Sequence, residues 1–266
     1  MAVSLTILGS GSSGNSTIIS SSKTNILVDA GFSCKEIFRR MKLAGFAPES
    51  LDAVLVSHEH GDHVDGVFVL ARKLRIPVFM TDATHHAWWR CIREKYEGKN
   101  LEKKESFSAG HAFQIGDVEV MPFTIPHDAV DPVAFTFRAE GVKVGIATDL
   151  GYLPENVKHY VRGCDCLMIE SNHDIEMLRT GPYPWQVKQR VLSKKGHLSN
   201  DALAEFFLSD YDGAAAFLVL AHLSEQNNHP ELARGAAERA LGSRSSLLQN
   251  RLMLAQQHEP LESIQL

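Results

Sequence analysis

The segment that most constrains the fold is residues 51–66, LDAVLVSHEHGDHVDG, in which an apolar run stops where three histidines and two aspartates begin. The apolar run predicts a buried strand, and side chains two apart in a strand point the same way. His58 and His60 are therefore expected on one face, with Asp62 and His63 where the chain turns into the next helix. Several imidazoles are costly to leave unpaired at the end of a buried strand. The H-x-H-x-D-H pattern thus favours half of a metal site over a solvated polar loop.

The same pattern of an apolar strand ending on a ligand-type residue recurs three times. His127 follows FTIP, Asp149 follows VGIAT and His222 follows FLVLA. Each of these residues alone is equally compatible with an ordinary loop position. Together with the first segment they supply seven ligands, the number that two adjacent metal ions use. Imidazoles and carboxylates suit zinc or manganese, with iron also compatible, and the set is too rich in nitrogen for calcium or magnesium. We therefore expect two divalent metal ions per chain.

Strand and helix patterns alternate along the whole sequence. A helix is predicted to begin at Ser33, with Glu36 completing a capping box, and to end near Gly45. A turn at Glu140-Gly141 joins two strands of the second half. The remaining expected strands lie near residues 3–8, 17–20, 25–31, 51–58, 76–80, 117–128, 164–172, 214–224 and 251–257, the last at a sheet edge, and the remaining helices near 65–75, 82–96, 154–162, 185–193, 197–210 and 231–241. This order predicts a single α/β domain over residues 1–266, built as two packed sheets with helices outside.

A glycine pattern near the start invites a different interpretation. Gly9, Gly11 and Gly14 spell G-x-G-x-x-G after a strand, and Asp29 lies at the distance of the acidic residue in a dinucleotide-binding motif. That motif requires a helix after the third glycine, whereas NSTIISSSKTNILVD is rich in serine and β-branched residues without a helical period. We expect instead a tight turn that carries Asn15 toward the site, where it contacts substrate.

The bulk properties bound the setting of the protein. The net charge of −5 does not by itself indicate a nucleic-acid partner, because the chain as a whole is not basic. A locally basic groove is still compatible with an acidic chain. The four cysteines are too few and too scattered for a disulfide framework. No signal peptide is visible, and no stretch approaches the roughly 20 apolar residues of a membrane span. We expect a cytoplasmic protein without membrane contact, and the sequence leaves its oligomeric state open.

The order H-x-H-x-D-H, His, Asp, His resembles the metallo-β-lactamase superfamily, and the spacing covers nearly the whole chain. The resemblance implies an αββα four-layer sandwich of two mixed sheets, with the metals at one edge between the sheets. It also implies two ligand sets joined by a bridging carboxylate. These are His58, His60 and His127 for one metal, Asp62, His63 and His222 for the second, and Asp149 between them. Fold alone does not determine which reaction such a site catalyses.

Two further motifs narrow the branch of the superfamily. Glu170 in IESNHD and His197 in KKGHLSND precede His222, an order that resembles the nuclease branches such as ribonuclease Z and ribonuclease J. There the acid and the extra histidine act together at the leaving group. With GSGSSGNS at the start and LSEQNN after His222, the chain is similar to the YycJ (WalJ) group, regarded as metal-dependent nucleases with proposed 5′-to-3′ exonuclease action on double-stranded DNA. The resemblance implies Asp62, Glu170 and His197 as catalytic residues.

Phosphodiester hydrolysis also follows from the residue types, because expelling an alkoxide needs a proton donor and His197 oriented by Glu170 has the right chemistry. The alternatives are a surface acid at Glu170 and a helix-flanking polar residue at His197, with Ser199 or Asn200 as the cap. A nucleic acid is the expected partner, with DNA favoured over RNA. Competing functions are a small-molecule metallo-hydrolase (cyclic nucleotide phosphodiesterase, thioesterase or lactonase), an RNA-processing ribonuclease, or a scaffold with a vestigial site.

Substrate contacts are predicted from fewer signals. The run WQVKQRVLSKKGH gathers Lys188, Arg190, Lys194 and Lys195 just ahead of His197. These residues could contact a phosphate backbone, although such a charge run on a helix is more often a solvated face. We expect Lys194, Lys195 and Ser199 in substrate binding. The tryptophans of HHAWW could stack bases, but core packing is the favoured interpretation for Trp88 and Trp89.

Overall fold

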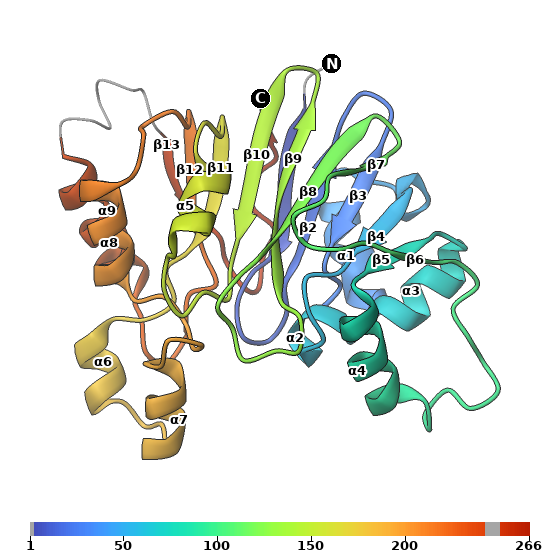
Figure 1. Cartoon of the computed structure of the whole chain (residues 1–266), viewed down its shortest axis with the longest axis horizontal. Helices are drawn as coiled ribbons and strands as arrows, with labels where there is room; N and C mark the ends of the chain where they lie inside the picture. The colour runs from blue at the N-terminus through green and yellow to red at the C-terminus, as the bar shows by residue number, and fades with distance from the viewer. Residues whose placement is uncertain (1–2, 243–250) are drawn as a thin grey trace.

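The computed structural model describes residues 3–242 and 251–266, which form two seven-stranded sheets packed face to face with helices on both outer faces (Figure 1). The first sheet has the order β14-β1-β2-β3-β4-β5-β6 and the second the order β13-β12-β11-β10-β9-β8-β7. The strands are β1 (Ser4–Gly9), β2 (Ser16–Ser20), β3 (Asn25–Val28), β4 (Ala53–Leu55), β5 (Val78–Met80), β6 (Lys104–Ser106), β7 (Phe113–Ile115), β8 (Val118–Thr124), β9 (Val133–Ala139), β10 (Val142–Ala147), β11 (Cys166–Glu170), β12 (Phe217–Ala221), β13 (Arg251–Leu254) and β14 (Ile264–Gln265). The predicted α/β sandwich is confirmed.

Each sheet is mixed in the same way. Strands β1 to β3 pair antiparallel and β3 to β6 parallel, while β7 to β10 pair antiparallel and β10 to β13 parallel. Because parallel strands need crossover connections, helices alternate with the strands in these parts of the chain. The predicted turn between β9 and β10 is present, with Glu140 and Gly141 both at positive φ.

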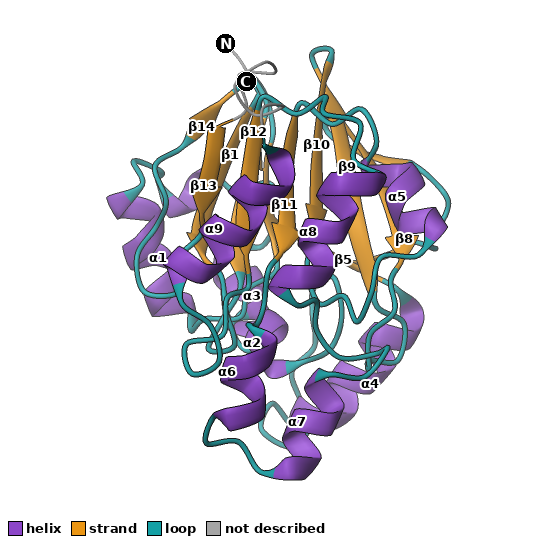
Figure 2. Cartoon of the chain, turned by 90° about the vertical axis from the view of Figure 1, so that its left-hand side faces the viewer, coloured by secondary structure: helices purple, strands orange, loops and turns teal. Residues whose placement is uncertain are grey.

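Helices cover both outer faces of the sandwich. They are α1 (Cys34–Leu43), η1 (Pro48–Ser50), α2 (Gly61–Val64), α3 (Val67–Leu74), α4 (Asp82–Ile92), α5 (Glu155–Val161), α6 (Ile175–Thr180), α7 (Trp185–Val191), α8 (Asn200–Ser209) and α9 (Pro230–Leu241). Apolar residues of α1, α3 and α4 pack on the first sheet, and those of α5, α8 and α9 pack on the second. Helices α6 and α7 instead project beyond one end of the sheets (Figure 2). No helix within residues 3–242 and 251–266 has the length and apolarity to cross a membrane.

The apolar patterns explain the core. One buried cluster fills the space between the sheets, with Leu5, Phe135 and Met168 among its members. Trp88 is 1% exposed in the layer between the first sheet and its helices, which confirms its predicted core packing. Ser33 caps α1 by accepting from the Glu36 backbone N–H, as predicted.

Several local features differ from the sequence predictions. The Glu36 carboxylate pairs with Arg39 and Arg40 rather than closing the reciprocal half of the capping box. Strands β6, β7 and β14 and helix α6 were not predicted. They are too short, and β6 too exposed, to produce an apolar period. The glycine-rich segment after β1 leads directly into β2 without a helix, so the dinucleotide-binding interpretation is excluded.

Candidate active site

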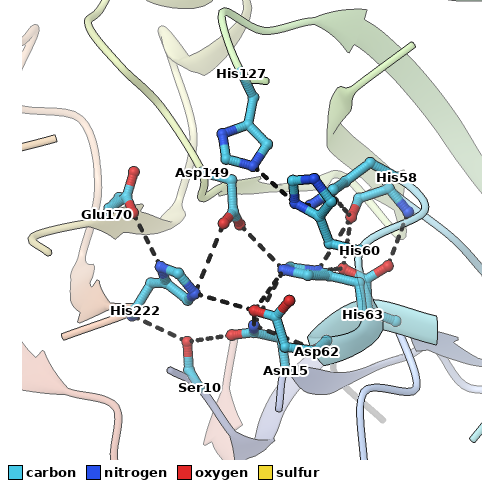
Figure 3. A network of polar contacts seen from close by, with 12 residues as sticks. Ser10, Asn15, His58, His60, Asp62, His63, His127, Asp149, Glu170 and His222 are labelled. Carbon is cyan, nitrogen blue, oxygen red and sulfur yellow. Dashed lines mark hydrogen bonds and ion pairs between the residues drawn. The ribbon is translucent and has the colours of Figure 1, made fainter. Parts of the chain in front are cut away.

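Three imidazoles converge where β4 and β8 end. His58 Nε2 and His127 Nε2 each lie 3.2 Å from His60 Nδ1 (Figure 3). Burial lowers the pKa of His58 well below its ordinary value, and it also lowers the pKa of His127. Both rings are therefore neutral near pH 7, with a lone pair available on one nitrogen. Three imidazole nitrogens at this spacing could hold one divalent cation.

A second cluster lies beside the first. His63 Nε2 is 3.5 Å from Asp62 Oδ2, and His222 Nε2 is 3.7 Å from the same oxygen. Asp149 faces both rings, with Oδ2 3.4 Å from His63 Nε2 and Oδ1 3.7 Å from His222 Nε2 (Figure 3). The structure thus brings together all seven residues that the sequence predicts as metal ligands.

Protein acceptors hold the outer nitrogens of these rings. His63 Nδ1 lies 2.8 Å from Asp29 Oδ2, and His222 Nδ1 lies 3.0 Å from Glu170 Oε1. His127 Nδ1 faces the Gly196 carbonyl at 3.3 Å. Because an acceptor beside Nδ1 keeps a proton on that atom, Nε2 is the nitrogen of each ring that is directed into the cluster and would be available to a metal ion. This is the arrangement by which proteins orient metal-binding histidines.

Asp29 is a site residue that sequence reasoning missed. Besides His63, its carboxylate accepts from the Ser57 backbone N–H and from Ser57 Oγ, both at 2.8 Å. The Ser57 hydroxyl, having donated to Asp29, is left to accept from His58 Nδ1 at 3.0 Å. One buried carboxylate therefore fixes rings of both clusters. The signal was present, because NILVDAG is another apolar strand that ends on a ligand-type residue.

The donor set fits divalent cations. Asp149 Oδ2 and His222 Nε2 are buried and have no hydrogen-bond partner within the described part of the chain. Burial opposes the charged form of Asp149, but His222 and His63 hold the pKa of its carboxyl well below the ordinary value. Burial likewise opposes charge on these two rings, yet Asp149 and the neighbouring carboxylates raise the pKa of each well above 6.5. The negative charge of the carboxylates is thus balanced by protons on the histidines in the metal-free protein. Bound metal ions would take the place of these protons.

Strand ends at the site adopt a sparsely populated backbone conformation. Asp29, Asp149 and His222 have φ values of 58°, 62° and 55°. Such conformations cost on the order of 1–3 kcal/mol each and persist where the surrounding structure fixes them. Three of the five non-glycine residues at positive φ in the described ranges belong to this cluster. The turn away from each strand directs the side chain into the space between the sheets.

Glu170 connects the cluster to His197. Its Oε1 lies 2.8 Å from His197 Nδ1 and 3.0 Å from His222 Nδ1, and Oε2 accepts from the backbone N–H groups of Leu150 and Leu198. Glu170 is fully buried, which opposes ionisation, but the adjacent His197 and the hydrogen bonds lower the pKa of its carboxyl. It is therefore a buried, fully bonded carboxylate and not the surface acid of the alternative interpretation.

A cavity of about 250 Å³ opens over the cluster. Five predicted site residues line it, namely His60, Asp62, Asp149, His197 and His222. It is also lined by Ser12, Asn172 and Tyr183, which were not predicted to contact substrate, and by Arg190, which belongs to the basic run WQVKQRVLSKKGH. The cavity is therefore formed between the metal-type cluster and the α6–α7 projection.

The four residues predicted to bind substrate lie elsewhere. Asn15 is buried beneath the cluster, with Nδ2 3.3 Å from Asp62 Oδ2 and 3.1 Å from His63 Nε2. Ser199 caps α8 by accepting from the Ala202 backbone N–H. Lys194 and Lys195 are exposed, and like the other two they are absent from the cavity lining. Asn15 thus supports the H-x-H-x-D-H loop, and Ser199 supports the position of the preceding His197.

Two mixed sheets covered by helices, with buried histidines and aspartates at the strand ends between them, define a protein of the metallo-β-lactamase fold. The family described as Beta-lactamase superfamily domain matches residues 24–222. "Exodeoxyribonuclease WalJ" of Streptococcus pneumoniae serotype 2 (strain D39 / NCTC 7466) is 41% identical over 85% of this chain and 84% of its own length. "Exodeoxyribonuclease YycJ" of Bacillus anthracis is 36% identical over 91% of this chain and 90% of its own. The chain therefore belongs to the metallo-β-lactamase superfamily and, within it, is YycJ (WalJ)-like.

A solved structure shares the fold at much lower sequence identity. The metallo-β-lactamase fold protein YhfI from Bacillus subtilis superposes with a TM-score of 0.68 at 18% identity, covering 98% of this chain and 99% of that chain. The similarity extends over both sheets and supports the architecture alone.

Proposed function

We propose that this protein is a metal-dependent nuclease that hydrolyses DNA from the 5′ end, in a single domain spanning residues 1–266. The observation that carries the proposal is the Glu170–His197 pair beside the histidine–aspartate cluster, because phosphodiester cleavage requires a proton for the departing alkoxide. The activity named for the two curated relatives supports the same class of substrate.

The proposed ligands form two sets. The first set offers three imidazole nitrogens and the second two imidazole nitrogens and a carboxylate oxygen, in each set within 4.8 Å of one another. His58, His60 and His127 would hold one ion, Asp62, His63 and His222 the other, and Asp149 would bridge them. Two zinc or manganese ions held in this way would polarise the phosphate and activate the attacking water.

The protein's own groups supply orientation and the proton. Glu170 fixes His197 through Nδ1 at 2.8 Å, which leaves Nε2 as the nitrogen available to a leaving group in the cavity. The same carboxylate oxygen holds His222, so the proton donor and the cluster share one anchor. Asp62, supported by Asn15, completes the proposed catalytic set as a carboxylate at the cavity floor.

Arg190 is the cationic group that would bind a phosphate of the substrate backbone. Its side chain lines the cavity and is 57% exposed. Asp128, the residue after His127, accepts hydrogen bonds from Nε and Nη2 of Arg190 and thereby holds the guanidinium at the mouth of the cavity. The Arg190 guanidinium keeps further N–H donors that are not bonded to Asp128 and can bind a phosphate oxygen.

The decisive experiment incubates the metal-reconstituted protein with end-labelled duplex DNA, single-stranded DNA and RNA. The expected result is stepwise loss of 5′-terminal nucleotides from DNA, and Asp62→Ala and His197→Ala should strongly reduce its rate. DNA that stays intact with zinc and with manganese, whatever its end chemistry, contradicts the proposal. Cleavage of RNA alone would instead assign an RNA-processing ribonuclease, and turnover of only cyclic nucleotides, thioesters or lactones a small-molecule hydrolase.

A further inference from the structure

The projection formed by α6 and α7 places an aromatic side chain at the cavity. The two helices are joined by residues 181–184, GPYP, beyond the end of the sheets (Figures 1 and 2). Tyr183 lines the cavity and is half-buried, whereas Trp185 is 66% exposed and does not line it. Neither ring stacks on another aromatic ring or on a cation within residues 3–242 and 251–266. Tyr183 is therefore an aromatic side chain at the cavity whose ring is not already stacked on another ring or cation of the described residues.

The turn that carries Tyr183 is held against the rest of the site. Gly181 packs so closely that an added Cβ would lie 2.5 Å from Asn227 Oδ1, and Asn227 itself lines the cavity. Pro182 and Pro184 flank Tyr183 and fix their own φ angles. The backbone of the turn is thus constrained before a substrate binds, which lowers the entropy cost of contact at Tyr183.

Helix α7 is anchored on the same wall of the cavity. Lys188 Nζ donates to the Arg179 carbonyl of α6 at 2.7 Å, which joins the two helices. Arg190 is bound to Asp128 in the loop that follows His127. A cation and an aromatic side chain from the α6–α7 projection therefore line the same cavity, a combination that binds single-stranded nucleic acid without reading its sequence.

We propose that Tyr183 is a stacking platform for the unpaired 5′-terminal nucleobase of the substrate strand, while Arg190 holds a phosphate of that strand. This inference rests on the proposed nuclease function and specifies its substrate as a strand end whose last base is free. The cavity volume of about 250 Å³ is small beside the roughly 300–1,000 Å³ of pockets for drug-sized ligands, and we take its occupant to be a single base released from its pair.

The test combines a protein variant with a modified DNA end. Steady-state kinetics are measured for wild-type protein and Tyr183→Leu, each on duplexes carrying a one-nucleotide 5′ overhang that is either a normal nucleotide or an abasic one. Leucine keeps apolar bulk but has no π-face. For wild-type protein, the abasic end is expected to raise KM about 5- to 150-fold. Tyr183→Leu is expected to lose a similar factor on the normal end and little more on the abasic end.

Matched variants separate stacking from structure. Tyr183→Phe keeps the aromatic ring and is expected to retain the preference for the normal end over the abasic end. Trp185→Ala changes a residue of the same projection outside the cavity and is expected to leave that preference unchanged. Metal content should be equal in all variants. Two results would overturn the platform. One is an equal rise in KM for Tyr183→Leu on the normal and the abasic end, and the other is a KM of Tyr183→Leu on the normal end that equals the wild-type value.

The unpaired end is tested separately with wild-type protein. A one-nucleotide overhang is expected to be cleaved with a lower KM than a blunt end closed by a G·C pair, since the paired base must first leave its stack. Equal KM values for the two ends overturn the requirement for a free base. Failure of wild-type protein to cleave any of these duplexes overturns the proposed function itself and the platform with it.

Discussion

Replacing Asp29 by asparagine tests whether the outer carboxylate prepares the cluster for metal. Asp29 accepts three hydrogen bonds of 2.8 Å, from the Ser57 N–H, from Ser57 Oγ and from His63 Nδ1. Asparagine has one acceptor oxygen and an NH₂ group of similar shape, so it can keep the bond from the Ser57 N–H but must present a donor toward His63. Asparagine also tolerates the φ of 58° at this position, which alanine would strain.

The expected result is selective loss of one metal ion. A donor facing His63 Nδ1 favours the tautomer with its proton on Nε2, which blocks the nitrogen directed at Asp62 and Asp149. Loss of such a partner typically weakens metal binding about 10- to 100-fold, or about 1.4–2.7 kcal/mol. The ion held by His58, His60 and His127 should bind more nearly as in the wild type.

Metal affinity is measured by competition with a chromophoric chelator, with fold checked by circular dichroism. Asp65→Asn is the matched control, because Asp65 lies in the same segment but is exposed, and it should bind both ions as the wild type does. Unchanged affinity of Asp29→Asn for both ions would refute the role assigned to this carboxylate.

Three further predictions address the proton donor, the pH dependence and the phosphate contact. His197→Ala should lower kcat on DNA about 10²- to 10⁴-fold with metal content unchanged, and the loss should shrink for a phosphodiester with a p-nitrophenolate leaving group; equal losses on both substrates would count against a proton donor. Burial opposes charge on His63 and His222, but the surrounding carboxylates raise the pKa of both rings well above 6.5. The protonated rings therefore stabilise the metal-free fold fully below about pH 6.5, and this stabilisation is lost progressively as the pH rises through the pKa values of the folded state. The Tm of chelator-treated protein should therefore fall above about pH 6.5, in scanning fluorimetry, while metal affinity rises; a Tm that climbs over this range disproves the assignment. Arg190→Ala should raise KM for DNA and reduce the slope of log affinity against log salt by about 0.7–0.9, measured by fluorescence anisotropy, and an unchanged slope argues against a phosphate contact.

The sequence pattern was sufficient for the architecture and for most of the cluster. Apolar strands that end on His or Asp mark the edge between the sheets, and the fold brings the ends of β4, β8, β10 and β12 together there. The same rule applied to β3 would have found Asp29. It was overlooked because Asp29 had been considered only as part of a dinucleotide motif, whereas its role depends on a contact with His63, 34 residues away.

The substrate side of the site was harder to predict. Helix α7 was predicted, but α6 has only six residues, too few for a clear period, and Tyr183 lies in the turn between the two helices. In sequence Arg190 is one member of a basic run, whereas in the structure it lines the cavity and the exposed Lys194 and Lys195 of that run do not. Which basic residue faces the cluster depends on the contact of Arg190 with Asp128, 62 residues away in sequence. No spacing rule encodes such a contact.

The central claim, that two metal ions in this cluster drive DNA cleavage, is tested most directly by titrating metal-free protein with manganese or zinc. Exonuclease rate and bound metal are measured together at each addition. We predict no cleavage without metal, and a rate that reaches its plateau when two ions are bound per chain. Cleavage by the metal-free protein, or a full rate with a single bound ion, would contradict the account.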